Sequence, residues 1–287
     1  MTDAPDLDLR QARRAFERAA ERYEAAAVLQ REVADRLLER LDYIRLQPRR
    51  VLDLGAGTGF CTWPLQDRYP RAQVLAMDFA HAMLRRARRP RRWFRRTPAF
   101  VCADARALPL AGASVELIVS SLMLQWCRPL APCLAEMRRV LAPGGLLLFT
   151  TFGPDTLKEL RAAWAQVDDA RHVHAFDDMH DVGDALLAAG FVDPVVDMEM
   201  LTVTYADVLD LMRDLQAIGA HNVATGRRAG LTGRGALRAM MRAYEGFRGE
   251  DGRLPATWEV VYGHAWVGEV PPPTPWPTGA IPLRQKK

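Results

Sequence analysis

The chain reads VLDLGAGTG from Val51 to Gly59, a short apolar run that leads through an acidic residue into three alternating glycines. The apolar run predicts a buried parallel strand, and the glycines predict a tight turn in which the backbone can approach a ligand closely. A second apolar run begins at Ala72 and ends in Asp78, twenty-five residues after Asp53. A glycine turn after one strand and a carboxylate at the tip of the next are typical of a nucleoside site, in which the acid binds the ribose hydroxyls.

The spacing of the glycines separates two kinds of nucleoside ligand. A dinucleotide fingerprint needs glycine or alanine at its sixth position, so that the helix packs closely and a pyrophosphate can bind. Phe60 occupies that position here, and the motif is G-x-G-x-G. It resembles motif I of the class I S-adenosylmethionine-dependent methyltransferases, whose ligand has no phosphate.

Apolar strand patterns alternate with helical patterns through the first half of the chain. Further strands are expected at 100–103, 115–120 and 146–150, with helices at 60–68, 81–89 and 130–141. Pro143-Gly144-Gly145 is expected to end the last of these helices and to lead into the next strand. This alternation predicts an α/β fold with a doubly wound, mostly parallel sheet, and the resemblance to class I methyltransferases implies seven strands in a Rossmann-like arrangement.

Beyond residue 151 the regular alternation of strand and helix patterns ends. Two helical segments at 206–218 and 234–247 precede a last strand pattern. We interpret this pair as an inserted lid over the cofactor site. The expected organisation is an N-terminal helical cover (1–47), a cofactor-binding core (48–204), a helical lid (205–250), a closing strand of the core (251–270) and a disordered proline-rich tail (271–287).

Ligands of open α/β sheets bind outside the carboxyl ends of the strands. Asp78 is expected to bind the ribose hydroxyls, Phe79 to pack on adenine, and Asp104 to accept from the adenine amino group. Asp53 would orient the ammonium group of the amino-acid moiety through water. Any one of these acids alone is more simply read as a helix cap or a turn residue, and it is their order at consecutive strand ends that favours a nucleoside site. The predicted cofactor residues are Asp53, Gly55, Ala56, Gly57, Gly59, Asp78, Phe79, Asp104, Ala105 and Ser120.

A closer resemblance extends over about residues 10–270. The chain is similar to the malonyl-acyl-carrier protein O-methyltransferases of biotin synthesis. The stretches that carry this resemblance are Phe16–Tyr23 with Leu29-Gln30, Leu124–Cys127, Phe149–Thr151 with Leu157, Glu159-Leu160 and Ala163-Trp164, and Ile218–Ala220 with Gly226-Arg227.

The resemblance implies transfer of a methyl group from S-adenosylmethionine to the free carboxylate of malonyl-acyl-carrier protein or malonyl-CoA, an early step toward pimeloyl groups and biotin. A malonyl carboxylate is ionised at pH 7, so the reaction needs no general base. A buried carboxylate needs hydrogen-bond donors or a cation, and our candidates are Tyr23 and Arg227. Gln125 and Trp126, after the fourth strand, would line the substrate channel. A surface charge is the simpler reading of Arg227, and core packing accounts for Trp126 equally well.

Two other readings remain open from the sequence. The same sheet could serve another acceptor, such as a small carboxylate, or a protein arginine, as in the related assembly factors of mitochondrial complex I. The chain could also bind the cofactor or a nucleic acid without catalysis.

The charge of the chain is concentrated in one segment. Eight arginines lie between Arg85 and Arg96, and without them 31 basic residues face 35 acidic ones. This run could be a solvated face or could steer an acidic carrier protein, and we rank that partner above nucleic acid because no second basic patch forms a groove.

The remaining patterns indicate a soluble cytoplasmic protein. No apolar run is long enough to span a membrane, and the N-terminus lacks the pattern of a signal peptide. The four cysteines have no C-x-x-C spacing, so we expect neither a disulfide framework nor a metal site. The histidines and aspartates between His172 and Asp181 are read as loop and cap residues, with Asp177 as the helix cap.

Overall fold

The computed structural model describes residues 7–88, 96–220, 222–223 and 233–268. Arg227, the proposed tail at 271–287 and most of the arginine run lie outside the described residues. No helix in the described ranges is long and apolar enough to cross a membrane.

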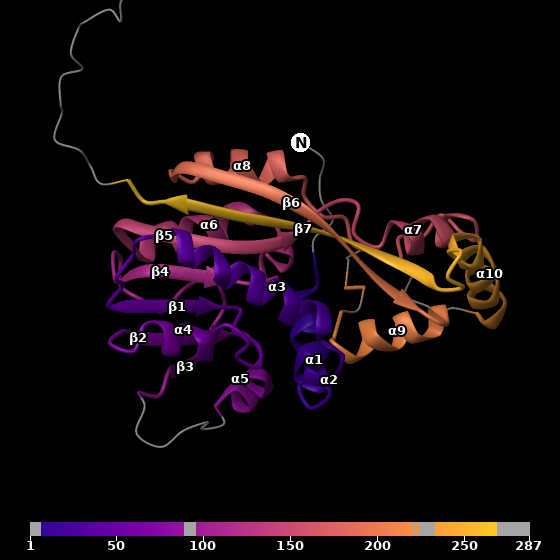
Figure 1. The fold of residues 1–287 in the computed structure, drawn as a ribbon, viewed down its shortest axis with the longest axis horizontal. Helices are drawn as coiled ribbons and strands as arrows, with labels where there is room; N and C mark the ends of the chain where they lie inside the picture. The colour runs from indigo at the N-terminus through magenta and orange to yellow at the C-terminus, as the bar shows by residue number, and fades with distance from the viewer. Residues whose placement is uncertain (1–6, 89–95, 221, 224–232, 269–287) are drawn as a thin grey trace, which may run out of the picture.

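Seven strands form one sheet in the order β3-β2-β1-β4-β5-β7-β6 (Figure 1). The first five are parallel, and β7 runs antiparallel to both β5 and β6. The predicted doubly wound, mostly parallel sheet of seven strands is confirmed. Its strands are β1 (Arg50–Leu54), β2 (Gln73–Asp78), β3 (Ala99–Cys102), β4 (Val115–Ser120), β5 (Leu141–Phe152), β6 (Val192–Tyr205) and β7 (Leu254–Trp266).

Helices precede, connect and follow these strands. The α-helices are α1 (Leu9–Ala19), α2 (Tyr23–Ala26), α3 (Val28–Glu39), α4 (Thr62–Arg68), α5 (His81–Ala87), α6 (Leu130–Val140), α7 (Lys158–Ala165), α8 (Met179–Ala188), α9 (Val208–Ala217) and α10 (Arg234–Tyr244). Short 3-10 turns are η1 (Arg40–Tyr43), η2 (Leu124–Trp126) and η3 (Glu245–Phe247).

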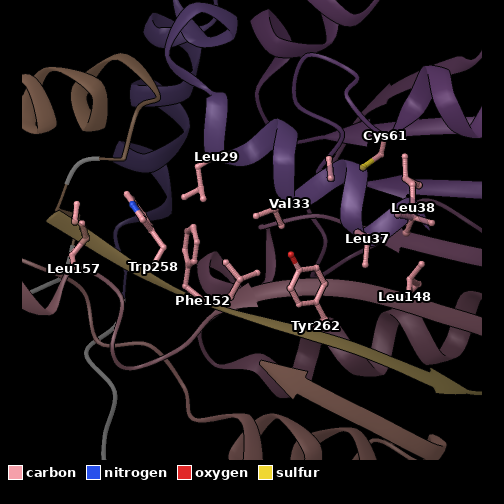
Figure 2. Close-up of a cluster of buried hydrophobic side chains, with 14 of the residues drawn as sticks. Leu29, Val33, Leu37, Leu38, Cys61, Leu148, Phe152, Leu157, Trp258 and Tyr262 are labelled. Atoms are coloured by element: carbon pink, nitrogen blue, oxygen red, sulfur yellow. The ribbon is translucent and has the colours of Figure 1, made fainter. Parts of the chain in front are cut away.

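Both faces of the sheet are buried, which explains why the central strands are continuous apolar runs. Along β1, Val51 packs into the core on the face of α3 and α4, whereas Leu52 and Leu54 pack into the core on the face of α6 and α8. Figure 2 shows the first of these cores, in which Leu29 and Val33 of α3 lie above β5 and β7.

Pro143-Gly144-Gly145 lies inside β5 rather than before it. Gly144 adopts a φ of 70°, and its N–H donates to the carbonyl of Val267 at 2.8 Å. The pairing of β4 with β5 shifts register between Val115 and Leu117, which accommodates the extra residues. The strand therefore begins at Leu141, earlier than the predicted start at residue 146.

The N-cap of helix α8 lies one residue later than expected. The side chain of Asp178 accepts from the N–H of His180, so Asp178 rather than Asp177 is the cap. Asp177 instead accepts from Arg128 at 2.8 Å, and the side chain of Arg128 is only 7% exposed. The sequence could not distinguish the two acids, because only the fold brings Arg128 beside one of them.

Strands β6 and β7 extend beyond the parallel strands, and α7, α9 and α10 lie at their far end (Figure 1). Helix α10 packs against α7, and α9 contacts α2. Gly219, just after α9, lies against α1, because a Cβ there would be 3.3 Å from Cδ1 of Phe16. The helical insertion thus contacts the N-terminal helices.

Candidate active site

A cavity lies at the carboxyl ends of β1, β2, β3 and β4, where α1 and α2 cover it. Six of the predicted cofactor residues and Tyr23 line it, together with apolar residues from α1, α5 and the segment after β4. The lining consists of Leu9, Phe16, Tyr23, Leu54, Gly55, Gly57, Met77, Asp78, Phe79, Met83, Ala103, Asp104, Ala105, Arg106, Ser121, Leu122, Met123, Trp126 and Cys127. We call it the first cavity.

The glycine turn forms the floor of this cavity. Gly55, Gly57 and Gly59 have φ angles of 79°, 52° and 90°, which side chains other than glycine rarely adopt. A Cβ at Gly55 would lie 2.5 Å from Cβ of Met123, whereas a Cβ at Gly57 would meet nothing within 4 Å. Gly55 is therefore required by packing within the protein, and Gly57 leaves open space toward the cavity.

Asp78 connects the second strand to the glycine turn. One carboxylate oxygen accepts from the N–H of Gly57 at 2.9 Å, and the other accepts from the N–H of Ala80 at 2.8 Å. Burial raises the pKa of Asp78 to about 6, although these two hydrogen bonds oppose the rise. Asp78 thus fixes the turn and presents a buried carboxyl group to the cavity.

Asp53 lies behind the cavity wall and is only 1% exposed. Its carboxylate accepts from the hydroxyl of Thr62 at the start of α4. Burial raises the pKa of Asp53 to about 7, and the hydrogen bond from Thr62 opposes this rise. An interaction of Asp53 with a cofactor ammonium through water stays a prediction.

Asp104 and Ala105 line the cavity beyond β3. The carboxylate of Asp104 accepts from Arg106 at 2.6 Å, and this ion pair holds the pKa of Asp104 below its ordinary value. Arg106 lines the same cavity and was not among the predicted site residues. Its position two residues after Asp104, a predicted site residue, is the sequence signal that could have found it.

Aromatic rings form the cover of the first cavity. The ring of Phe16 lies edge-on to Phe79 and to Trp126, with centroid distances of 5.9 and 5.2 Å. Burial and then the charge of Asp78 raise the pKa of Tyr23, so its phenol remains protonated at neutral pH. Phe16 belongs to a helical apolar pattern and to the Phe16–Tyr23 stretch of the family resemblance, but neither signal places it at the cofactor cavity.

Other predicted residues lie outside the lining of the first cavity. Ser120 is fully buried, and its hydroxyl donates to the carbonyl of Leu54 at 2.9 Å. Ala56 and Gly59 belong to the turn but do not line the cavity, and Gln125 lines a different one. For these residues a role at the cofactor or acceptor stays a prediction.

A second cavity lies on the other side of Trp126, which lines both. Its walls come from η2, β5, α7, the segment before α8, α9 and β7. They consist of Gln125, Trp126, Phe152, Leu157, Leu160, His172, Val173, His174, Phe176, Leu215, Ala220, Asn222 and Trp258. The helical insertion contributes Leu215, Ala220 and Asn222 here, whereas none of its described residues lines the first cavity.

Histidines stand on one wall of the second cavity. His172 pairs with Asp168 at 2.8 Å and stacks on Trp164, with a centroid distance of 3.7 Å. His174 packs edge-on to Trp126, and its Nε2 accepts from the N–H of Val223 at 3.3 Å. Within the described ranges no three histidine, cysteine or acidic side chains gather as a metal site.

The fold and the position of the first cavity define a class I methyltransferase. Residues 52–149 match the family described as a methyltransferase domain. The YcgJ protein from Bacillus subtilis superposes with a TM-score of 0.57 at 14% identity, over 81% of this chain and 98% of that one. Phosphoethanolamine N-methyltransferase 2 of Haemonchus contortus, solved in complex with S-adenosyl-L-methionine, gives a TM-score of 0.53 at 14% identity, over 88% of this chain and 57% of that one.

Sequence similarity narrows the class further. A malonyl-acyl-carrier protein O-methyltransferase from Halorhodospira halophila is 56% identical over 265 residues, which are 92% of this chain and 90% of the relative. The chain belongs to the family of malonyl-acyl-carrier protein O-methyltransferases.

Proposed function

We propose that this enzyme transfers a methyl group from S-adenosylmethionine to the free carboxylate of a malonyl group carried as a thioester by an acyl-carrier protein. The observation that carries the proposal is the 56% identity, over 92% of the chain, to a relative named for this reaction. The first cavity supports it, because its glycine turn, Asp78 and aromatic cover are arranged as a nucleoside site requires.

The described residues fit the cofactor. Gly57 leaves room for close approach of a ligand to the turn, since a Cβ there would contact nothing within 4 Å. Asp78 is placed to accept from ribose hydroxyls, and Phe79 and Met83 offer an apolar surface for adenine. When bound, S-adenosylmethionine supplies a methyl group that its sulfonium already activates.

The protein's own task is to position the acceptor and exclude water. A malonyl carboxylate is ionised at neutral pH, so no base is needed to prepare it. Because the phenol of Tyr23 stays protonated, it can donate a hydrogen bond to that carboxylate in the cavity. Phe16 and Trp126 close the cavity against water, which strengthens this interaction and aligns the reacting groups. Arg227 remains our second candidate to bind the carboxylate.

We also propose that arginines steer the carrier protein, which is acidic. Of the run from Arg85 to Arg96, the structure describes four arginines, and three of them, Arg85, Arg88 and Arg96, are exposed. A second row stands on the solvent face of α1, with Arg10, Arg14 and Arg18 one turn apart. Glutamine at Arg85, Arg88 and Arg96 should raise the KM for the carrier-bound substrate about threefold at low salt, and less at high salt.

The glutamine variant of the α1 row is the matched comparison for this experiment. A rise in KM only with the α1 variant would place the carrier on α1 and reject the run as its docking surface. We place the enzyme in the cytoplasm, which is supported by its four free cysteines. We further propose that the helical insertion is a lid whose contacts with α1 and α2 secure their cover over the first cavity.

Purified protein incubated with labelled S-adenosylmethionine and malonyl-acyl-carrier protein tests the proposed reaction. The expected result is a carrier heavier by one methyl group, with the label lost in mild base as an ester requires. Succinyl-acyl-carrier protein controls for chain length. Cofactor binding without transfer to any carrier-bound carboxylate would reject the proposal and leave the fold intact.

A further inference from the structure

Two polar atoms in the wall of the second cavity are buried and have no hydrogen-bond partner among the described residues. They are Nε1 of Trp258 and Oε1 of Gln125. Buried polar atoms of folded proteins are nearly always paired, since an unpaired one loses its water without compensation. A cavity that presents two such atoms is therefore expected to bind a ligand that pairs with them.

Trp258 supplies a hydrogen-bond donor. Its side chain stands on β7 between Phe152 and Leu157, as Figure 2 shows, and the residue is 5% exposed. An indole nitrogen can only donate. The strand fixes its position, because β7 pairs along its whole length with β6 and also with β5.

Gln125 supplies a hydrogen-bond acceptor. Its amide nitrogen donates to the carbonyl of Leu122 at 2.7 Å. A carbonyl oxygen cannot donate, so this bond requires the nitrogen on that side and leaves the Oε1 atom as the unpaired one. The rest of the wall is mostly apolar, with Phe152, Leu157 and Phe176 among its members.

One donor and one acceptor in an apolar cavity complement an amide group. A carboxylate offers only acceptors and would face the oxygen of Gln125 unfavourably. An amide offers a carbonyl to Trp258 and an N–H to Gln125. The thioester arm through which carrier proteins and coenzyme A hold acyl groups contains amides a few bonds from the sulfur.

We infer that the second cavity binds the amide-bearing thioester arm of the acceptor, with Trp258 donating to an amide carbonyl and Gln125 accepting from an amide N–H. This inference rests on the proposed function. Since Trp126 lines both cavities, an arm in the second cavity can place the malonyl carboxylate in the first, beside Tyr23. The arrangement recognises the arm, which carrier protein and coenzyme A share.

The test compares two acceptors that differ only in the arm, malonyl-pantetheine and a malonyl thioester of an alkyl thiol of equal length. Trp258→Phe should lower kcat/KM about tenfold for malonyl-pantetheine and leave the alkyl thioester within about twofold. Gln125→Met should show the same selectivity. Tyr262→Phe is the matched control, because it removes another unpaired buried polar group from β7 outside both cavities.

Equal losses with both acceptors would assign Trp258 a purely structural role, and no loss with either would show that its N–H is not used. Either result overturns the inference. Malonyl-CoA should show the same loss of kcat/KM in the variants as malonyl-pantetheine. The same loss with malonyl-acyl-carrier protein would show that this cavity recognises the arm and not the surface of the carrier.

A binding measurement separates failure of this inference from failure of the proposed reaction. The indole N–H resonance of Trp258, assigned by its loss in Trp258→Phe, should shift when malonyl-pantetheine is added and stay in place with the alkyl thioester. This shift is expected even if no methyl transfer occurs. If this resonance does not shift on addition of malonyl-pantetheine while methylation proceeds, the second cavity is rejected as the binding site of the arm.

Discussion

The two cavities share Trp126, yet they are built from the chain in different ways. Most of the first cavity comes from consecutive strand ends, so its residues follow one another in the order of β1, β2, β3 and β4. The second collects side chains from η2, β5, α7, α9 and β7, which lie up to 133 residues apart between Gln125 and Trp258. A site at the ends of parallel strands can therefore be predicted from the sequence, whereas a site between remote elements cannot.

The glycine turn gives the largest expected effect and tests whether the two cavities are independent. Gly55→Ala places a Cβ against Met123 and forces a strained φ, so we expect the free energy of unfolding to fall by about 3 kcal/mol. Gly57→Ala, which clashes with nothing in the protein, should cost only about 1 kcal/mol. Urea unfolding measures both.

The same pair should separate the cavities in binding. Both alanine variants should bind S-adenosylmethionine about 100-fold more weakly, as measured by calorimetry. Gly55→Ala does so by displacing Met123, and Gly57→Ala by filling the open space at the turn. The indole N–H shift of Trp258 with malonyl-pantetheine should remain in both variants. Loss of that shift in the Gly57→Ala protein would contradict the separation of the two cavities.

Asp78 gives a smaller effect that depends on pH. Asp78→Asn should lower the affinity for S-adenosylmethionine about thirtyfold at pH 7.5, because a hydrogen bond to an ionised carboxylate is replaced by a weaker one. In the unaltered protein the affinity should fall about tenfold between pH 7.5 and pH 5.

The direction of this pH dependence follows from the raised pKa of Asp78. Burial sets this pKa at about 6, and hydroxyl donors of the bound cofactor favour the ionised form, so binding releases a proton as the pH falls below about 6. An asparagine side chain cannot titrate, so the Asp78→Asn variant should lose most of the dependence. We expect the remaining slope to come from Asp53, because burial raises its pKa to about 7. An unchanged pH profile in the variant would exclude Asp78 as the titrating group.

Trp126 gives the smallest expected effect and the only one that reaches both cavities. Trp126→Phe keeps an aromatic ring between Phe16 and His174 but removes part of its apolar area. We expect the Kd for S-adenosylmethionine and the KM for malonyl-pantetheine to rise about threefold each. Trp63→Phe, at a tryptophan outside both linings, is the control. An effect on one ligand alone would show that Trp126 belongs functionally to a single cavity.

Strand ends were predictable because the responsible patterns are local. The run from Val51 to Gly59 contains the strand, the acid and the turn, and the structure brings six predicted cofactor residues into one cavity. The details of hydrogen bonding were not predictable. Asp78 accepts from Gly57 across 21 residues, and Arg106 pairs with Asp104 because both follow β3. Such pairings depend on side-chain positions that periodicity does not encode.

Two features could not be predicted from the sequence, for the same reason. Pro143-Gly144-Gly145 became part of β5, because the bulge with β4 and a hydrogen bond to Val267 provide partners there. Asp177 is paired with Arg128, and Asp178 caps α8. In each case a contact between remote segments outweighed the local pattern.

By itself, the sequence determined the class of fold, the nature of the cofactor site and the family. Continuous apolar runs, positive-φ glycines and acids at strand ends are local consequences of backbone sterics and of burial on both faces of a sheet. Only the tertiary structure decided that Trp258 and Gln125 face one cavity, and that Trp126 joins it to the first. Their meeting depends on how β7 and η2 pack against the rest of the chain, and packing of remote elements leaves no periodic trace in the sequence.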